Sequence, residues 1–191
     1  MSVSVLDPKS ALLVIDLQKG IAAMAAAPNA APAVARVVAQ ARLLAQAFRR
    51  RGLPVVLVNV AGLPPGRTEQ GARRMDLPPD WTELLPELDR QPGDHVVTKR
   101  TWGAFADTGL AQYLAGQGVS QVVIAGVATS IGVESTAREA YALGFNVILA
   151  LDAVADMNAE AHANSVERIF PRLGETGATG EIVALLDGGR R

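Results

Sequence analysis

Residues 121–144 read QVVIAGVATSIGVESTAREAYALG, and this stretch decides the fold. It begins with a short apolar run over residues 121–125 that is rich in β-branched side chains, a pattern typical of a strand buried on both faces. From Val133 onward, apolar side chains recur at helical spacing with charged residues on the other side. Small residues fill the turn between the two halves. The stretch therefore predicts a buried strand that passes sharply into a helix.

The turn over residues 126–132 has two interpretations. A strand-to-helix turn presents backbone N–H groups and a helix N-terminus at the carboxyl end of a parallel strand. Open α/β sheets bind their ligands at this edge, which favours a functional site. Alternatively, the turn is a tight connection whose glycines only relieve backbone strain. The stretch taken by itself fits both interpretations.

The rest of the chain repeats the alternation of apolar strands and amphipathic helices. Further strands are expected at residues 10–16, 55–60, 94–98 and 145–151, with a short sixth strand within 174–180. Further helices are expected at residues 33–51, 81–84, 108–116 and 159–170, and from the last turn to about residue 186. Residues 61–79 are rich in Gly and Pro, and loops of this length are usually functional or disordered. The alternation predicts an α/β fold with a mostly parallel sheet covered on both faces.

Composition limits the possible functions. The 191 residues suit a single domain, and 49% hydrophobic with 19% charged residues is typical of a globular protein. A net charge of −1 gives no reason to expect nucleic acid or a membrane as partner. The apolar run at residues 11–15 is too short for a signal peptide or a membrane span, so we expect a cytoplasmic location. The chain has no cysteine, which excludes disulfides, thiolate metal sites and a cysteine nucleophile.

Polar residues follow several of the predicted strands, namely Asp16, Lys99 and, in the turn, Thr129 or Ser130. Because the carboxyl ends of parallel strands share one edge of a sheet, these residues can converge in one cleft. Each also has a structural explanation, as a helix or turn cap or, for Lys99, as a solvated strand end. Both explanations stay open from the pattern alone. The functional one is an acid paired with an ammonium group in a single cleft.

Three segments resemble the isochorismatase-like hydrolases, also called the cysteine hydrolase superfamily: LLVIDLQ at 12–18, TKRTWGAF at 98–105 and GVATSIGVESTAREAYALG at 126–144. The similarity covers about residues 10–187 in the same order and spacing. It implies a Rossmann-like, three-layer α/β/α fold with six parallel strands, filling one domain over residues 1–191. It also implies an active site built from an aspartate, a lysine and a cysteine, and Asp16 and Lys99 match the first two positions.

The third position holds Gly132, where the chain departs from the main pattern of the family. Nicotinamidases and related amidohydrolases attack a carbonyl with a cysteine thiolate, which this chain lacks. Ser130 and Ser135 are the nearest hydroxyls, but both sit off the matching position. Nicotinamidases also hold a metal after the second strand. The two histidines here, His95 and His162, lie elsewhere in the sequence, so we expect neither a catalytic metal nor another cofactor.

The family that the chain resembles includes the true isochorismatases, which cleave the vinyl ether of isochorismate. Some of these enzymes carry glycine at the third position, as this chain does. Protonating the terminal carbon of a vinyl ether gives an oxocarbenium ion that water captures, so the enzyme supplies an acid and no nucleophile. We expect Asp16 to be this acid. Its pKa must then be high enough to hold a proton, although a nearby Lys99 lowers it. The missing side chain at Gly132 leaves room for the substrate.

Substrate contacts are expected from six residues near the matched positions: Gln18, Arg67, Trp102, Phe105, Ala128 and Thr129. An arginine can bind a carboxylate with two hydrogen bonds, and Arg73 and Arg74 are alternatives to Arg67, although loop arginines are commonly solvated. The two aromatic residues can form a pocket wall or pack against a helix. The resemblance also implies a cis peptide bond between Val127 and Ala128.

Two functions follow from these observations. The first is a cysteine-independent hydrolase acting on a small carboxylated molecule, such as an isochorismate-type vinyl ether. The second is a catalytically inactive family member that binds a small molecule or acts as a scaffold. Retention of Asp16 and Lys99 favours the enzyme, because a buried charge pair costs desolvation that an inactive protein has no reason to keep. In both cases we expect a small-molecule partner and a homo-oligomer, either a dimer or a tetramer.

Overall fold

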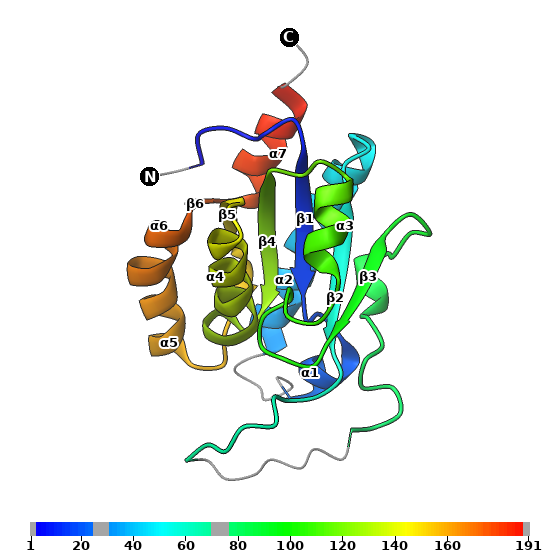
Figure 1. Cartoon of the computed structure of the whole chain (residues 1–191), viewed down its shortest axis with the longest axis vertical. Helices are drawn as coiled ribbons and strands as arrows, with labels where there is room; N and C mark the ends of the chain where they lie inside the picture. Colours follow the sequence, from blue (N-terminus) through cyan, green and yellow to red (C-terminus); the bar gives the residue numbers. More distant parts are fainter. Residues whose placement is uncertain (1–2, 25–30, 70–76, 189–191) are drawn as a thin grey trace.

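The computed structural model of the chain describes residues 3–24, 31–69 and 77–188. Within these ranges, six parallel strands form one sheet in the order β3-β2-β1-β4-β5-β6 (Figure 1). The strands are β1 (Ser10–Ile15), β2 (Val55–Val60), β3 (His95–Lys99), β4 (Gln121–Val127), β5 (Asn146–Ala155) and β6 (Glu175–Gly177). The predicted α/β class with a parallel sheet of six strands is confirmed.

Helices cover both faces of the sheet (Figure 1). They are α1 (Lys19–Met24), α2 (Ala31–Arg50), α3 (Leu110–Gly116), α4 (Glu134–Ala142), α5 (Ala159–Asn164), α6 (Phe170–Leu173) and α7 (Thr179–Gly188). A π-helical turn, Ser165–Ile169, joins α5 to α6, so the single helix expected at 159–170 is three consecutive helical segments. No helix in the described ranges is long and apolar enough to cross a membrane.

Alternate side chains of β1 enter two separate cores. Leu12 and Val14 pack with α2 and α7, whereas Leu13 and Ile15 pack with α3 and α4 on the other face. All six residues of β1 are buried. A strand whose side chains are buried on both faces reads as a continuous apolar run, because neither face alternates with polar residues. This burial explains why the apolar runs of the sequence predict the strands so directly.

The sequence expectations were wrong at two places near the site. Residues 81–84 are not helical; they make turns and one antiparallel bridge, Gln18↔Leu84, and the helical turn comes later at Pro86–Leu88. The short helix α1 was not predicted. Tertiary contacts hold it in place: the Lys19 N–H donates to the Glu83 carbonyl, and Trp81 packs directly over Gly20. A helix of six residues is too short to show a periodic apolar pattern, and it is not stable without tertiary contacts. The sequence pattern therefore does not predict it.

The order of the strands places a topological switch point between β1 and β4. The chain builds β1, β2 and β3 outward in one direction, then returns to pair β4 with β1 and continues in the other direction. Ligands bind at such a point, beyond the carboxyl ends of the strands. Gly126 of β4 has φ 123°, and an added Cβ would overlap the Ile15 carbonyl of β1. Glycine at this position therefore permits the two central strands to approach.

Candidate active site

Asp16 is the first residue after β1, at the switch point. Its backbone has φ 55°, in the left-handed region where non-glycine residues are uncommon and aspartate is enriched. Its N–H donates to the Val58 carbonyl and its own carbonyl accepts from the Gln18 N–H. The residue is 6% exposed and lines a cavity of about 820 Å³. Residues held in sparsely populated backbone conformations cluster at functional sites, which favours such a role here.

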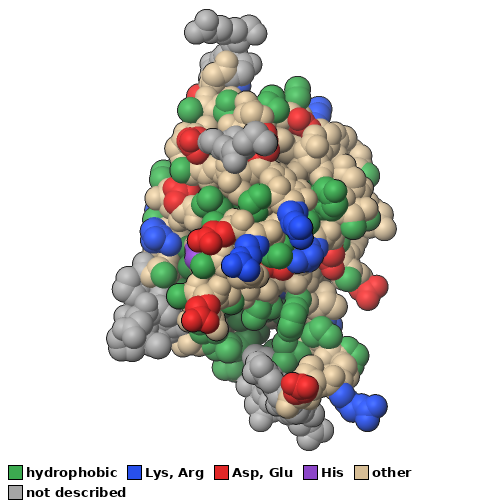
Figure 2. Space-filling view, turned by 90° about the vertical axis from the view of Figure 1, so that its left-hand side faces the viewer, with side chains coloured by type: hydrophobic (Ala, Val, Ile, Leu, Met, Phe, Trp, Pro, Cys, Tyr) green, Lys and Arg blue, Asp and Glu red, His purple; other side chains and the backbone are tan. Residues whose placement is uncertain are grey.

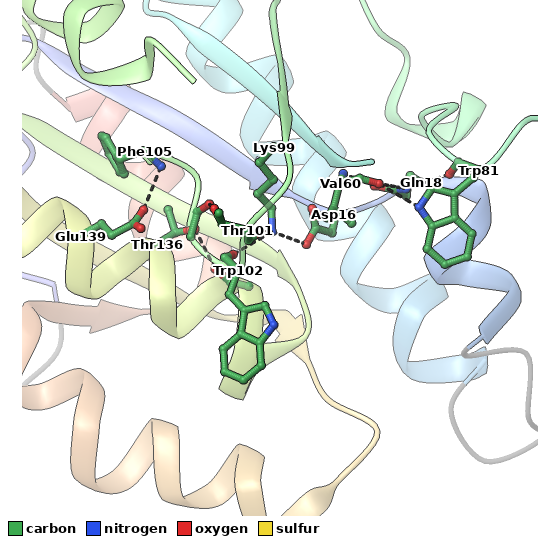
Figure 3. A network of polar contacts seen from close by, with 12 residues as sticks. Asp16, Gln18, Val60, Trp81, Lys99, Thr101, Trp102, Phe105, Thr136 and Glu139 are labelled. Carbon is green, nitrogen blue, oxygen red and sulfur yellow. Dashed lines mark hydrogen bonds and ion pairs between the residues drawn. The ribbon is translucent and has the colours of Figure 1, made fainter. Parts of the chain in front are cut away.

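Lys99, the last residue of β3, forms a buried ion pair with Asp16 (Figure 3). Its Nζ lies 2.9 Å from Asp16 Oδ2, 2.7 Å from the Trp102 carbonyl and 3.2 Å from the Thr101 carbonyl. An ammonium group has three N–H donors, and these three acceptors use them all. Lys99 therefore ties Asp16 to the segment that follows β3. The predicted proximity of Asp16 and Lys99 is confirmed.

Burial dominates the electrostatics of Asp16. It raises the pKa of the carboxyl from 3.8 to about 6, against the charge and hydrogen bond of Lys99, which lower it. Oδ1 is buried and has no hydrogen-bond partner among the described residues. Because Oδ2 accepts from Lys99, a proton on the carboxyl belongs on Oδ1. The carboxyl group thus has one oxygen anchored by Lys99 and the other without a hydrogen-bond partner among the described residues.

The turn after β4 brings Gly132 against this carboxyl. The Val127–Ala128 peptide is cis, as predicted, and a π-helical turn, Thr129–Val133, leads into α4. An added Cβ at Gly132 would lie 2.9 Å from Asp16 Oδ2, closer than real Cβ atoms come to other atoms. It would also lie 3.1 Å from Ile15 Cγ2. The missing side chain therefore makes room for the Asp16 carboxyl, and Gly132 and Ala128 both line the cavity.

The hydroxyls of the turn are already hydrogen-bonded. Thr129 is fully buried, outside the cavity lining, with Oγ1 2.9 Å from His162 Nδ1. Ser130 lines the cavity, and both its N–H and its hydroxyl donate to Asp156 Oδ2, at 2.8 and 2.7 Å. Asp156 also accepts from the Asn158 N–H. Asp156 thus fixes the turn against the end of β5, a role that the sequence analysis did not assign.

Gln18 supports the wall of the cavity from behind. It is fully buried; its Nε2 donates to the carbonyls of Val60 and Trp81, and its Oε1 accepts from the Val60 N–H (Figure 3). The indole N–H of Trp81 donates to the same Val60 carbonyl at 2.8 Å. Gln18 is not among the residues that line the cavity. Its contacts instead hold Trp81, which forms part of the lining.

The remaining predicted contact residues lie in different surroundings. Trp102 lines the cavity with its side chain 53% exposed. Phe105 is buried against Phe145 and lies outside the cavity lining. Arg67 is exposed and also lies outside the lining. The alternatives at positions 73 and 74 fall outside the described residues.

Glu139 of α4 holds the segment that gives its carbonyls to Lys99. The Phe105 N–H donates to Glu139 Oε2 at 2.8 Å (Figure 3). The carboxylate fits against the bare Cα of Gly103, where an added Cβ would overlap it. From the sequence, Glu139 is one of the charged residues expected on the polar side of this helix. Its role depends on a contact across 34 positions, which no local pattern reveals.

Most of the cavity lining was not predicted, because it is apolar and comes from scattered elements. It includes residues of α1, α2 and α5, the last residues of β4 and β5, and the segments after β2, β4 and β5: Ile21, Met24, Ala33, Val34, Leu63, Leu77, Trp81, Val127, Ile131, Ala155, Met157 and Ala161. Among the described residues, the charged side chains of the lining are Asp16, Glu69, Lys99 and Asp156. In the part of the chain that the structure describes, no three His, Asp or Glu side chains gather as metal ligands would.

The fold and the site together define an α/β protein with a buried acid–ammonium pair at the switch point of its sheet. Residues 10–181 match the model of the isochorismatase domain, which covers most of the chain. The chain therefore belongs to the isochorismatase family, whose hydrolases make up the cysteine hydrolase superfamily.

Individual relatives agree with this assignment. The chain is 40% identical over 183 residues to YwoC, an isochorismatase family protein of Bacillus subtilis, covering 92% of this chain and 93% of that protein. It is 33% identical over 175 residues to a maleamate amidohydrolase of Pseudomonas putida, covering 87% of this chain and 82% of the relative. An isochorismatase family protein of Burkholderia thailandensis has a similar structure, with a TM-score of 0.83 at 39% identity, over 97% of this chain and all of the other.

Proposed function

We propose that the chain is a hydrolase of this family that works without a cysteine nucleophile and uses Asp16 as a general acid. The observation that carries the proposal is the buried Asp16 carboxyl in the cavity, with its pKa raised to about 6 and Oδ1 unpartnered. A general acid works best when its pKa lies near the pH at which it operates. An anchored carboxyl that holds a proton part of the time near neutral pH meets this requirement.

The reaction that needs such an acid and no nucleophile is hydrolysis of a vinyl ether, and isochorismate is the type of substrate we propose. Asp16 Oδ1 gives its proton to the terminal carbon, and the electron pair of the C=C bond forms the new C–H bond. Water adds to the resulting oxocarbenium ion and loses a proton, which returns to the carboxylate. The hemiketal then breaks its C–O bond, giving a carbonyl product and an alcohol; from isochorismate these are pyruvate and a dihydroxydiene acid.

Lys99 and Gly132 support this step without reacting. The ammonium group remains bound to Oδ2, so it stabilises the carboxylate that forms when the proton leaves Oδ1. Gly132 keeps the space beside the carboxyl open. We propose that it occupies the position where cysteine-dependent members of the family carry their nucleophile. We do not assign the thiol's role to the nearby Ser130 hydroxyl, because Ser130 lies off the matched position and its N–H and hydroxyl both hold Asp156.

Substitution of the acid tests the proposal. Wild-type protein should release pyruvate from isochorismate, and Asp16→Asn should lower kcat by about 10²–10⁴-fold, the usual contribution of a general acid, while substrate still binds. Asp89→Asn, a change at an exposed carboxylate of the surface pair with Arg42, is the control and should leave kcat unchanged.

A further variant separates an acid-dependent hydrolase from a decayed cysteine enzyme. Gly132→Cys should not improve cleavage of a vinyl ether, because that reaction forms no acyl intermediate. If the wild type proves inert towards isochorismate and Gly132→Cys creates amidase activity, the acid-dependent proposal is wrong. The protein would then be an inactive family member that binds a small molecule.

The proposal extends to the assembly and its location. We propose that residues 1–191 form one domain that works in the cytoplasm as a homo-oligomer, a dimer or a tetramer. Tyr141 and Leu143 at the end of α4 are exposed hydrophobic side chains, and such surface suits contact with a second copy. Sedimentation velocity of the purified protein tests the assembly, and a monomer at all concentrations would contradict it.

A further inference from the structure

We propose that the substrate carries a bulky, uncharged apolar group, which occupies the part of the cavity beyond the Asp16 carboxyl. The inference rests on the proposed function, because it names the substrate class of the same site. Isochorismate, a compact dicarboxylate, then serves as the test compound for vinyl-ether cleavage, and the preferred substrate is a vinyl ether that also bears this larger apolar group. Four observations carry it: the volume of the cavity, the chemistry of its wall, the exposed hydrophobic side chains that gather there and the distribution of its charges.

The volume of the cavity exceeds what a compact acid needs. Cavities of about 300–1,000 Å³ typically enclose drug-sized ligands, and this one, at about 820 Å³, lies in the upper half of that range. Asp16, Lys99 and Gly132 occupy one part of the lining, and α1, α2 and Trp81 supply another. A substrate whose ether bond reaches Asp16 therefore leaves the α1–α2 part of the cavity for the rest of its structure.

The wall of that part is apolar and firmly held. Ile21, Met24 and Val34 line it from α1 and α2. Trp81 adds its ring, fixed by the hydrogen bond from its Nε1 to the Val60 carbonyl and by close packing over α1. Binding to such a wall removes apolar surface from water and offers no partner for a polar group. The wall therefore favours an aliphatic or aromatic group.

Exposed hydrophobic side chains also gather at the cavity. Nine large hydrophobic side chains are exposed in the described ranges, and five of them line this cavity: Met24, Leu63, Trp102, Ile131 and Met157. Figure 2 shows hydrophobic side chains concentrated toward the lower end of the molecule, where the strands of the sheet finish in Figure 1. Apolar surface that gathers in one place usually marks a binding site, and here it borders the candidate acid.

The charges of the described lining disfavour an anionic group. Its one cation is Lys99, whose three N–H donors are already used by Asp16 and two backbone carbonyls. The other charged side chains of the lining, Glu69 and Asp156, are carboxylates that repel an anion. Among the described residues, no arginine lines the cavity. The described lining therefore offers apolar contact, which an uncharged group fits better than an anion.

Tryptophan fluorescence can test the inference directly, since the two tryptophans of the chain, Trp81 and Trp102, both line the cavity. Two unreactive, non-aromatic probes are compared: 4-tert-butylcyclohexyl ethyl ether, which is uncharged, and cyclohexane-1,4-dicarboxylate. We expect the ether to change the emission and to bind at least about tenfold more tightly than the dicarboxylate, a difference of about 1.4 kcal/mol. Equal or weaker binding of the ether would overturn the inference.

A matched pair of variants locates the binding. Val34→Asp places a charge in the apolar wall and should weaken binding of the ether by about tenfold or more. Leu43→Asp places the same charge on an exposed position of α2 outside the cavity lining and should have no effect. Circular dichroism checks that both variants fold. Equal effects of the two variants would overturn the inference, and if Val34→Asp does not fold, the comparison of probes on the wild type still decides.

The results separate this inference from the proposed function. Tight binding of the ether without turnover of any vinyl ether would support the inference and contradict the proposed function. Turnover of isochorismate with no preference for the uncharged probe would do the reverse. A second copy covering the exposed hydrophobic side chains is the competing explanation. If sedimentation and fluorescence show that self-association alone shields Trp102 and that no probe binds, the inference is wrong.

Discussion

The buried carboxyl of Asp16 sets a pH dependence that can be measured directly. Burial raises its pKa from 3.8 to about 6, although the charge and the hydrogen bond of Lys99 act in the opposite direction. If Asp16 donates the proton, kcat/KM follows the protonated fraction. That fraction is about a half at pH 6, about a tenth at pH 7 and about a hundredth at pH 8. Cleavage of a vinyl ether should therefore slow about fivefold between pH 6 and pH 7 and about tenfold with each further pH unit.

Two measurements test this dependence independently. The first is kcat/KM against pH between about 4.5 and 8.5. The second is a ¹³C NMR titration of the aspartate carboxyl carbons, in which the Asp16 signal is the one lost in Asp16→Asn. Lys99→Met keeps the length of the side chain and removes the charge that lowers the pKa, so both midpoints should move to higher pH. A flat rate profile, with the Asp16 signal titrating near pH 4, would refute the reasoning.

The same raised pKa has a consequence for stability. The folded protein binds the Asp16 proton more tightly than the unfolded chain, so this contribution is full below pH 3.8 and is lost as the pH rises through about 6. The gap between the two pKa values corresponds to roughly 3 kcal/mol. Urea titrations measure the free energy of unfolding of the wild type and of Asp16→Asn. Between about pH 4 and pH 7, the wild type should lose up to that amount of unfolding free energy relative to the variant.

Three further substitutions test the surroundings of the pair. Gly132→Ala places a Cβ against Asp16 Oδ2 and should lower kcat about tenfold or more with little change in KM, as steady-state kinetics would show. Gly126→Ala forces β4 away from β1 and should reduce the free energy of unfolding by about 3 kcal/mol or more, as measured by urea titration. Gly93→Ala is the control and should leave this free energy nearly unchanged, because there is open space around Gly93. Glu139→Leu leaves a backbone N–H of the segment after β3 without its acceptor and should cost about 1–3 kcal/mol in unfolding free energy, whereas Glu139→Gln keeps an acceptor and should cost less.

The strands and the meeting of Asp16 with Lys99 could be predicted from the sequence because both depend on simple rules. A strand buried on both faces is a continuous apolar run, and β2 begins and ends where its run does, at Val55–Val60. The carboxyl ends of parallel strands share one edge, so residues that directly follow two such runs come together. The ion pair between Asp16 and Lys99 follows from this rule.

The wall of the cavity could not be predicted, because each of its parts depends on tertiary contacts. The helix α1 is held by Trp81 and Glu83, far along the chain, and carries no periodic signal of its own. Gln18 stands two residues after the acid in the family motif, yet its amide faces the backbone behind Trp81. Whether a polar side chain points into a cavity or supports it from behind depends on the packing of neighbours, which spacing does not encode.

The position of β1 in the middle of the sheet has a consequence for synthesis of the chain. One edge of β1 pairs with β2, which is synthesised early, whereas the other edge pairs with β4. At a translation rate of about 5–20 residues per second, β4 is completed on the order of ten seconds after β1. Until then a strand with five apolar residues, Ala11–Ile15, has an open edge, which is a template for aggregation. A product that stops before Gln121 already contains Asp16 and Lys99 but lacks the strand that closes this edge. We expect such fragments to be recovered as aggregates, so that premature termination yields neither a folded core nor a partial enzyme.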